Sequence, residues 1–198
     1  MKKMNKRGIS SVLVALAIVI VVVIVTGLII VGLNNSLIVA NVKVDNEWSQ
    51  VRIQYQRRYD LIPNVVEVTK DYMEFEQELL LNITHARTAW AESLSSTIEE
   101  QMAAGNDLNA VMGQFLVTVE NYPELKSIEA VLTLVDELEG TENRIAVARG
   151  RYNDAVASYN TMVQVFPTSV IANMFGHQIR PYYYGDEGIE DVPGVDLR

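Results

Sequence analysis

The chain has 198 residues, of which 16 are Lys or Arg and 25 are Asp or Glu, and it contains no cysteine. Its net charge of -9 repels phosphate backbones and argues against a nucleic-acid partner. Without cysteine, the chain has no disulfide framework, no thiolate nucleophile and no thiolate metal site.

Residues 12–33 form an apolar segment without a charged side chain. Four basic residues stand just before this segment, namely Lys2, Lys3, Lys6 and Arg7. At about 1.5 Å of rise per residue, a helix over this segment is about 33 Å long and crosses a hydrocarbon core of about 30 Å. In lipid such a helix satisfies its own backbone hydrogen bonds. We predict a basic cytoplasmic flank over residues 1–8 and a transmembrane helix over 9–33.

Two other interpretations of this segment remain open. A cleaved secretory signal has an apolar region of about 7–15 residues and a small residue at its cleavage site, for which Ala40 is a weak candidate. The apolar run is longer than that, which favours an uncleaved anchor. The sequence KRGISS at 6–11 also resembles the class III signal of type IV pilin-like proteins, which are cut after the glycine. Gly8 and Ile9 are therefore a candidate processing site, and the apolar helix would then pack in a filament.

The charges that flank the apolar segment predict its orientation. After the segment, Lys43 is soon followed by Asp45 and Glu47, so the basic residues are concentrated before it. By the positive-inside rule the amino terminus is cytoplasmic and the rest of the chain lies outside a plasma membrane. The alternatives are a cytoplasmic body and an extracellular filament. Because the body is acidic, anionic headgroups repel it and hold it away from the bilayer.

Beyond the anchor, apolar residues recur every three or four positions, at Val44, Trp48, Val51 and Tyr55. This spacing predicts that the transmembrane helix continues outward as an amphipathic stalk. Pro63 lacks a backbone donor and clashes with the preceding turn, so we expect the helix to kink or restart there, with Asp60 as an N-cap.

A second stripe predicts one helix of roughly forty residues. It consists of Leu61, Val65, Val68, Tyr72, Phe75, Leu79, Ile83, Ala86, Trp90, Leu94 and Ile98. We expect residues 104–107 to end this helix, with Gly105 as a left-handed cap and Asn106 or Asp107 capping the next helix.

Two further helices follow in the prediction. Leu108, Val111, Phe115 and Val119 indicate a shorter helix that ends at 121–123. The last long segment alternates strictly by three and four, which is the repeat of a coiled-coil-like helix. Its seam is Val131, Leu134, Leu138, Thr141, Ile145, Ala148, Tyr152, Ala155, Tyr159, Met162 and Phe166. Pro167 stops it, and a short apolar turn runs to Gly176.

No stretch has the pattern of a strand, so the predicted fold is all-α. Long helices with brief breaks bury their apolar faces only against each other. We predict a single amino-terminal transmembrane helix that continues into an antiparallel bundle of long helices over 34–176, followed by an extended tail over 177–198. In this tail, Tyr182, Tyr183 and Tyr184 either form an interface or fold back, with alternate rings covering the end of the bundle.

Several blocks of the sequence are similar to those of the LemA family. RRYDLIPNVV at 57–66 is similar to its RRYDLIPNLV stretch, and YPELK at 122–126 to its YPDLK. EGTENRIAVAR at 139–149 matches the end of its ELEGTENRIAVAR block, and RYNDAV at 151–156 follows in the expected order, with Phe-Pro at 166–167 after it. The resemblance covers about residues 44–184.

This resemblance implies a bacterial or archaeal membrane protein with one amino-terminal span and a bundle of long helices. It brings no established enzymatic activity, no catalytic residues and no cofactor. Members of the family are often described with the bundle in the cytoplasm, which conflicts with the orientation that the charges of this chain predict.

Catalytic and metal-binding patterns are not apparent in the sequence. His85 and His177 lack partners at helical ligand spacing and lie outside any HExxH context. Glu74, Glu76, Glu78, Glu99 and Glu100 are scattered around the helix as a solvated face, not paired across a cleft. No GxSxG, phosphate-binding loop or dinucleotide fingerprint occurs. We therefore predict a protein that is not an enzyme and holds no metal or cofactor.

A cluster of charged and amide residues is more informative. In the antiparallel arrangement, Arg57, Arg58 and Asp60 face a group on the last helix. That group is Glu142, Asn143, Arg144 and Arg149, with Asn153 beyond it. Because the arginine fork binds carboxylates in bidentate fashion, the cluster is interpreted as an inter-helix clamp that fixes register. A partner or anion site is the alternative.

These features predict a membrane-anchored helical-bundle scaffold or interaction protein of the cell envelope. Its expected partners are the lipid bilayer and other membrane or envelope proteins, with self-association as a further option. The alternative is a type IV pilin-like subunit that is processed after Gly8 and assembled through its apolar helix. A small-ligand sensor that binds an anion between helices is a third hypothesis.

Overall fold

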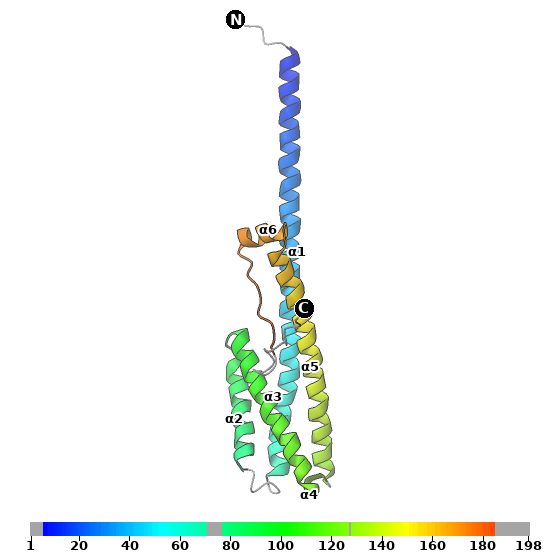
Figure 1. Cartoon of the computed structure of the whole chain (residues 1–198), viewed down its shortest axis with the longest axis vertical. Coiled ribbons are helices and arrows are strands. Elements are labelled where there is room, and N and C mark those ends of the chain that lie inside the picture. The colour runs from blue at the N-terminus through cyan, green and yellow to red at the C-terminus, as the bar shows by residue number, and fades with distance from the viewer. Residues whose placement is uncertain (1–5, 71–76, 127, 185–198) are drawn as a thin grey trace, which may run out of the picture. The chain divides into compact units, whose positions relative to one another are not determined.

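The computed structural model describes residues 6–70, 77–126 and 128–184, and within these ranges all regular structure is α-helical (Figure 1). The prediction of an all-α chain is therefore confirmed. The described residues divide into two compact units. Unit 1 comprises the residues up to Lys43 and Ser158–Arg180, and unit 2 comprises Val44–Ala157 and the described residues from Pro181 onward.

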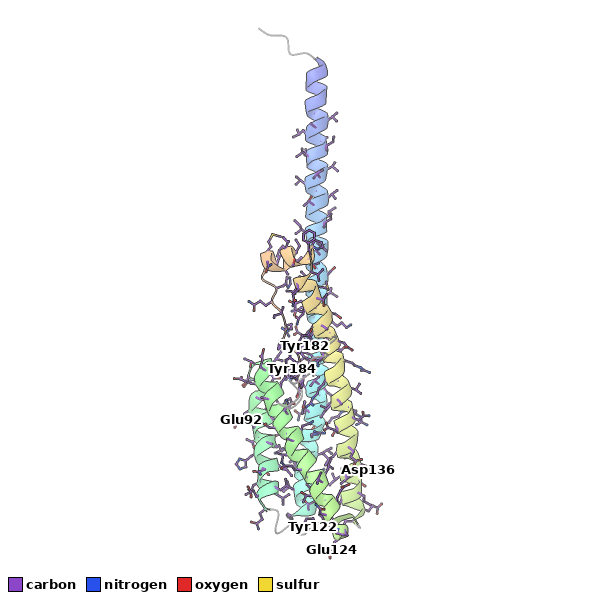
Figure 2. The ribbon with its side chains drawn as sticks, in the orientation of Figure 1. Glu92, Tyr122, Glu124, Asp136, Tyr182 and Tyr184 are labelled. Atoms are coloured by element: carbon purple, nitrogen blue, oxygen red, sulfur yellow. The ribbon has the colours of Figure 1, made fainter. Side chains whose placement is uncertain are left out.

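The first helix, α1, spans Lys6–Thr69 and contains the predicted anchor. Of the described helices, this one alone is long and apolar enough to cross a membrane. Its apolar side chains in unit 1 are exposed on every face, from Leu13 through Val31 (Figure 2). Near its junction with the rest of unit 1, Leu37 is buried and Asn34 Oδ1 lies 3.0 Å from His177 Nε2.

The predicted break at Pro63 is wrong, because α1 continues through Pro63 to Thr69. A proline at this position leaves the carbonyl of Tyr59, four residues earlier, without its usual helical donor. The side chain of Arg87 replaces that donor, since its Nε donates to the Tyr59 carbonyl at 3.3 Å while its guanidinium lies 4.0 Å from the Tyr59 ring centroid. Asp60 is not an N-cap and instead accepts a hydrogen bond from Gln56 at 2.9 Å.

The predicted helix of forty residues is also wrong. The structure has α1 ending at Thr69, then α2 over Gln77–Ser93 and α3 over Ile98–Asn121. The apolar spacing carries on across the break before α3, but a capping box formed by Thr97 and Glu100 starts a new helix there. Tyr72 and Phe75 of the predicted stripe lie outside the described residues.

Residues 104–107 do not end a helix, since α3 runs through them. Gly105 is needed for close packing and not for a left-handed cap. A Cβ atom at Gly105 would lie 2.8 Å from Cζ of Tyr55, so any side chain there would push the tyrosine ring of α1 away. The close approach of α1 and α3 at this point positions the polar network described below.

Three further helices follow within the described residues, namely α4 (Pro123–Lys126), α5 (Glu129–Gln164) and α6 (Thr168–Phe175). The seam of α5 is buried from Val131 to Tyr159 as its spacing predicts, except at Leu134, which is half-buried. Phe166 is an exception with 78% of its surface exposed, because α5 ends at Gln164 before the seam reaches it. Gly176 ends α6 with a φ of 75°, which glycine adopts without strain.

In unit 2, parts of α1 and α5 lie beside α2 and α3 as a four-helix bundle (Figure 1). Its largest fully buried side chains come from all four helices and include Tyr55, Trp90, Phe115 and Tyr152. The ring centroids of Tyr55 and Trp90 are 4.6 Å apart. The bundle core thus combines aliphatic side chains with a few large aromatic rings, and next to Tyr55 it is polar.

Candidate functional site

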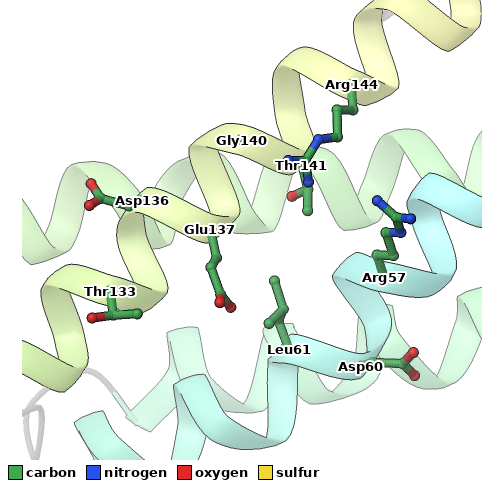
Figure 3. A pocket seen from close by; sticks show the side chains of 9 residues that line it. All are labelled: Arg57, Asp60, Leu61, Thr133, Asp136, Glu137, Gly140, Thr141 and Arg144. Carbon is green, nitrogen blue, oxygen red and sulfur yellow. The ribbon is translucent and has the colours of Figure 1, made fainter.

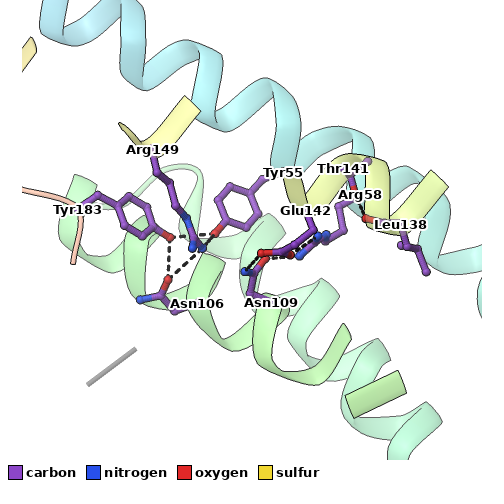
Figure 4. Close-up of polar contacts among 9 residues, drawn as sticks. All are labelled: Tyr55, Arg58, Asn106, Asn109, Leu138, Thr141, Glu142, Arg149 and Tyr183. Atoms are coloured by element: carbon purple, nitrogen blue, oxygen red, sulfur yellow. Dashed lines mark hydrogen bonds and ion pairs between the residues drawn. The ribbon is translucent and has the colours of Figure 1, made fainter. Parts of the chain in front are cut away.

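Arg58, Asn109 and Glu142 form a closed polar ring that joins three helices of unit 2 (Figure 4). Arg58 of α1 is 1% exposed, and its Nη2 lies 2.5 Å from Oε2 of Glu142 on α5. Its Nη1 donates to Oδ1 of Asn109 on α3, whose amide nitrogen in turn donates to Oε1 of Glu142 at 3.0 Å. The buried guanidinium is thereby bound to one carboxylate and one amide, and we call this set the arginine ring.

A second cluster lies one helical turn away, where Tyr55, Asn106, Arg149 and Tyr183 meet (Figure 4). The hydroxyl groups of Tyr55 and Tyr183 are 2.9 Å apart, and Arg149 donates to both Tyr55 and Asn106. The Arg149 guanidinium also lies 4.4 Å from the Tyr183 ring centroid, within cation–π range. We call these four residues the tyrosine cluster.

The tyrosine cluster has a defined donor order. Arg149 has only N–H groups to offer, so the Tyr55 oxygen accepts from it. The Tyr183 hydroxyl has one proton, which is directed at the amide oxygen of Asn106, so the Tyr55 hydroxyl is the donor to the Tyr183 oxygen. The Tyr183 hydroxyl then donates to Oδ1 of Asn106 at 2.9 Å. Burial raises the pKa of both Tyr55 and Tyr183, and the nearby Arg149 charge opposes this rise only in part. Both phenols are therefore neutral donors at physiological pH.

The segment that carries Tyr183 is held on α5 mostly through its backbone. The Asn153 side chain donates to the Tyr183 carbonyl at 2.9 Å and accepts from the Tyr183 amide at 2.8 Å. The Tyr152 hydroxyl donates to the Pro181 carbonyl at 2.8 Å. Tyr183 itself is 4% exposed whereas Tyr184 is 73% exposed. One ring of the tail thus folds back into the bundle and its neighbour remains available for contacts.

The residues predicted as a single cluster separate into an inner and an outer group. Arg58, Glu142 and Arg149 take part in the buried networks described above. Arg57, Asp60 and Arg144 are exposed and line a pocket between α1 and α5 instead (Figure 3). Asn143 is exposed on α5. Gly8 and Ile9 lie in α1, but their side chains are outside the described part of the chain.

Sequence reasoning missed four members of the two networks, namely Tyr55 as a polar residue, Asn106, Asn109 and Tyr183. A signal exists for three of them, Tyr55, Asn106 and Asn109. Tyr55 and Arg58 on α1 and Asn106 and Asn109 on α3 have the same spacing of three, which places each pair on one helix face. Among the described residues, no group of three His, Asp or Glu side chains is arranged to hold a metal ion.

Comparison with known proteins identifies related sequences. The model of the LemA family matches residues 47–197 of the chain. The magnetosome protein MamQ 2 of Paramagnetospirillum magneticum is 24% identical over 169 residues, covering 73% of this chain and 62% of the relative. MamQ of Magnetospirillum gryphiswaldense is 23% identical with the same coverage. Protein LemA of Metamycoplasma hominis is 23% identical over 142 residues, covering 72% of this chain and 64% of the relative.

The chain thus spans about three fifths of the length of these curated relatives. The match includes both polar networks, since all of their residues fall within 47–197. These relatives lend no support to the alternative of a pilin-like subunit.

Proposed function

The chain belongs to the LemA family, and we propose that it is a membrane-anchored helical-bundle scaffold that works through protein–protein contacts at the cell envelope. The observation that carries this proposal is the apolar part of α1. Its side chains from Leu13 through Val31 are exposed on every face, with no other described helix covering them. Such a surface is stable in lipid and not in water.

The bundle of unit 2 is suited to a fixed contact surface. The arginine ring and the tyrosine cluster bind α1, α3, α5 and the tail to each other at defined atoms. Buried polar contacts of this kind favour one helix register over its alternatives. We infer that the two networks hold the outer faces of the bundle in one arrangement, which a partner then recognises.

Exposed apolar side chains on unit 2 mark where such contacts can form. Leu81 of α2 and Val117 of α3 are both more than half exposed. Single exposed apolar residues are common, so these two are best used as probe positions.

We also propose that the bundle lies outside the cytoplasm. Four basic residues precede the apolar segment, whereas Lys43 after it is followed by acidic residues. Basic residues close to a span have the strongest influence on its orientation. The acidic body is then kept off the membrane surface by anionic headgroups.

Anchoring and contact can be tested together in cells. A photo-cross-linking amino acid at position 117 of the full chain is expected to give discrete adducts, and the chain should remain in the membrane pellet after alkaline extraction. A variant with Val21→Lys and Ile24→Lys should leave the pellet and lose the adducts, because each charge at the centre of a span costs about 2.5–3.5 kcal/mol.

A matched control carries the same two lysines on unit 2, at the exposed positions Leu81 and Leu132. This control should stay in the pellet. If the full chain is extracted at alkaline pH, the anchor is refuted. If it stays in the pellet and no exposed position of unit 2 gives an adduct, the scaffold role is refuted and the anchor stands.

A further inference from the structure

A pocket of about 560 Å³ lies between α1 and α5 within unit 2 (Figure 3). Residues 57–61 of α1 form one wall and residues 133–144 of α5 form the other. It is separate from the buried networks, since none of their residues lines it. Leu61, Gly140 and Thr141 form its middle, Thr133 and Asp136 lie at one end, and Arg57 and Arg144 lie at the other (Figure 3).

The charges in this pocket are sorted by sign. Arg57 and Arg144 reach into one end from opposite helices, while Glu137 extends from α5 toward Leu61 (Figure 3). Asp136 lines the far end, but its carboxylate points away from that of Glu137. Asp60 also lines the pocket beside Arg57, but its carboxylate points away from the two arginines and accepts a hydrogen bond from Gln56. Like charges that share one end of a pocket repel each other, and a bound group of opposite charge relieves that repulsion.

Within the part of the chain that the structure describes, the ion pair is that of Arg58 with Glu142, and Arg57, Arg144, Asp136 and Glu137 have no ion-pair partner. The guanidinium forks of Arg57 and Arg144 therefore keep donors for a carboxylate, which arginine binds in bidentate fashion. The Glu137 carboxylate offers acceptors for an ammonium group.

The separation of the two ends sets the length of a ligand. Arg144 and Glu137 are seven residues apart on α5, which corresponds to about 10 Å along the helix. An extended chain of three residues also spans about 10 Å. We propose that this pocket binds a short extended peptide of about three residues, with its terminal carboxylate at Arg57 and Arg144 and its terminal ammonium at Glu137. A central apolar side chain would rest on Leu61.

Gly140 leaves room for this ligand. A Cβ atom at Gly140 would have no neighbour within 4 Å, so the wall of the pocket is open where the middle of the peptide would lie. We expect a larger side chain at this position to extend into the pocket, because its Cβ atom would meet no packed neighbour.

The test uses the purified full chain in nonionic detergent at low salt, titrated calorimetrically with Gly-Leu-Gly. We expect saturable binding that is about tenfold or more weaker for the N-acetylated peptide and for the C-terminal amide, since each cap removes one set of charge-assisted hydrogen bonds. Free leucine should also bind at least about tenfold more weakly, because its charges are too close together to reach both ends.

Variants of the protein locate the site. Arg144→Gln and Glu137→Gln should each weaken binding by about tenfold, and Gly140→Leu should abolish it without lowering the melting temperature. Arg52→Gln removes an exposed arginine of α1 outside the pocket and should leave the affinity unchanged.

Three results would overturn the proposal. The first is no saturable heat for Gly-Leu-Gly. The second is equal affinity for the free and the N-acetylated peptide, which would make the pocket a plain anion site. The third is an equal loss of affinity in Arg52→Gln and Arg144→Gln, which would make the binding non-specific. None of these results bears on membrane anchoring.

Discussion

Replacing Tyr152 with alanine is expected to lower the free energy of unfolding by about 3–5 kcal/mol, the typical cost of truncating a large buried aromatic side chain. Tyr152 has 0% of its surface exposed, and its ring centroid is 5.3 Å from that of Trp48. Its hydroxyl also binds the Pro181 carbonyl, so the substitution removes both core packing and one attachment of the tail. Denaturant unfolding of the full chain in detergent, followed by circular dichroism, measures the change.

Two matched variants separate the causes. Tyr152→Phe keeps the ring and should cost only about 1 kcal/mol, the net value of one hydrogen bond. Phe166→Ala removes a ring that belongs to the same sequence repeat but is exposed, so it should have almost no effect. Equal losses for Tyr152→Ala and Phe166→Ala would mean that α5 has a different buried face.

Replacing Glu142 with alanine is expected to cost about 3 kcal/mol, the lower end of the range for stranding one partner of a buried ion pair. Arg58 is buried and would keep its charge with only Asn109 as a partner. The side chain of Glu142 is 47% exposed, so removing Arg58 instead of Glu142 should lower the free energy of unfolding by less. Arg58→Met removes the buried charge and leaves a carboxylate that water can reach, and we expect a smaller loss from it.

Thermal unfolding of both variants and of Glu139→Ala, an exposed acid on the same helix, makes the comparison. Glu139→Ala should change stability by less than about 0.5 kcal/mol. If Arg58→Met costs more than Glu142→Ala, the arginine contributes mainly through its packing and the arginine ring is not the register device proposed above.

The sequence predicts most of the fold where one periodicity covers one helix. The seam of α5 is an example, because its alternation by three and four is uninterrupted from Val131 to Tyr159. The prediction is wrong where the apolar spacing happens to continue across a break, as it does before Thr97. There, a capping box decides the structure and hydrophobic spacing carries no information about it.

At Pro63 and Gly105 the sequence predicts helix breaks that the structure does not have. Both residues normally disrupt a helix, and both lie inside one here. A side chain distant in sequence determines each outcome: Arg87 supplies the donor for the carbonyl left by Pro63, and the Tyr55 ring occupies the space beside Gly105. Contacts of this kind arise only from tertiary packing, which local propensity does not encode.

The candidate site was predictable only in part, because some of its contacts also depend on tertiary packing. Charged residues are seldom buried without partners, so Arg58, Glu142 and Arg149 could be selected from the sequence as a group. The separation of Arg57 and Arg144 from them depends on the rotation of α1 and α5 about their axes. Tyr183 required the path of the tail along α5, which its sequence does not indicate.

The central claim is that α1 anchors an acidic bundle outside the cytoplasm. Protease added to intact cells tests it most directly, with the chain detected through a tag at its amino terminus and a cytoplasmic protein as the control for leakage. We predict that the bundle is digested while the tagged anchor fragment and the cytoplasmic control remain intact. Complete protection of the chain in intact cells, with digestion only after lysis, would contradict the account and place the bundle in the cytoplasm.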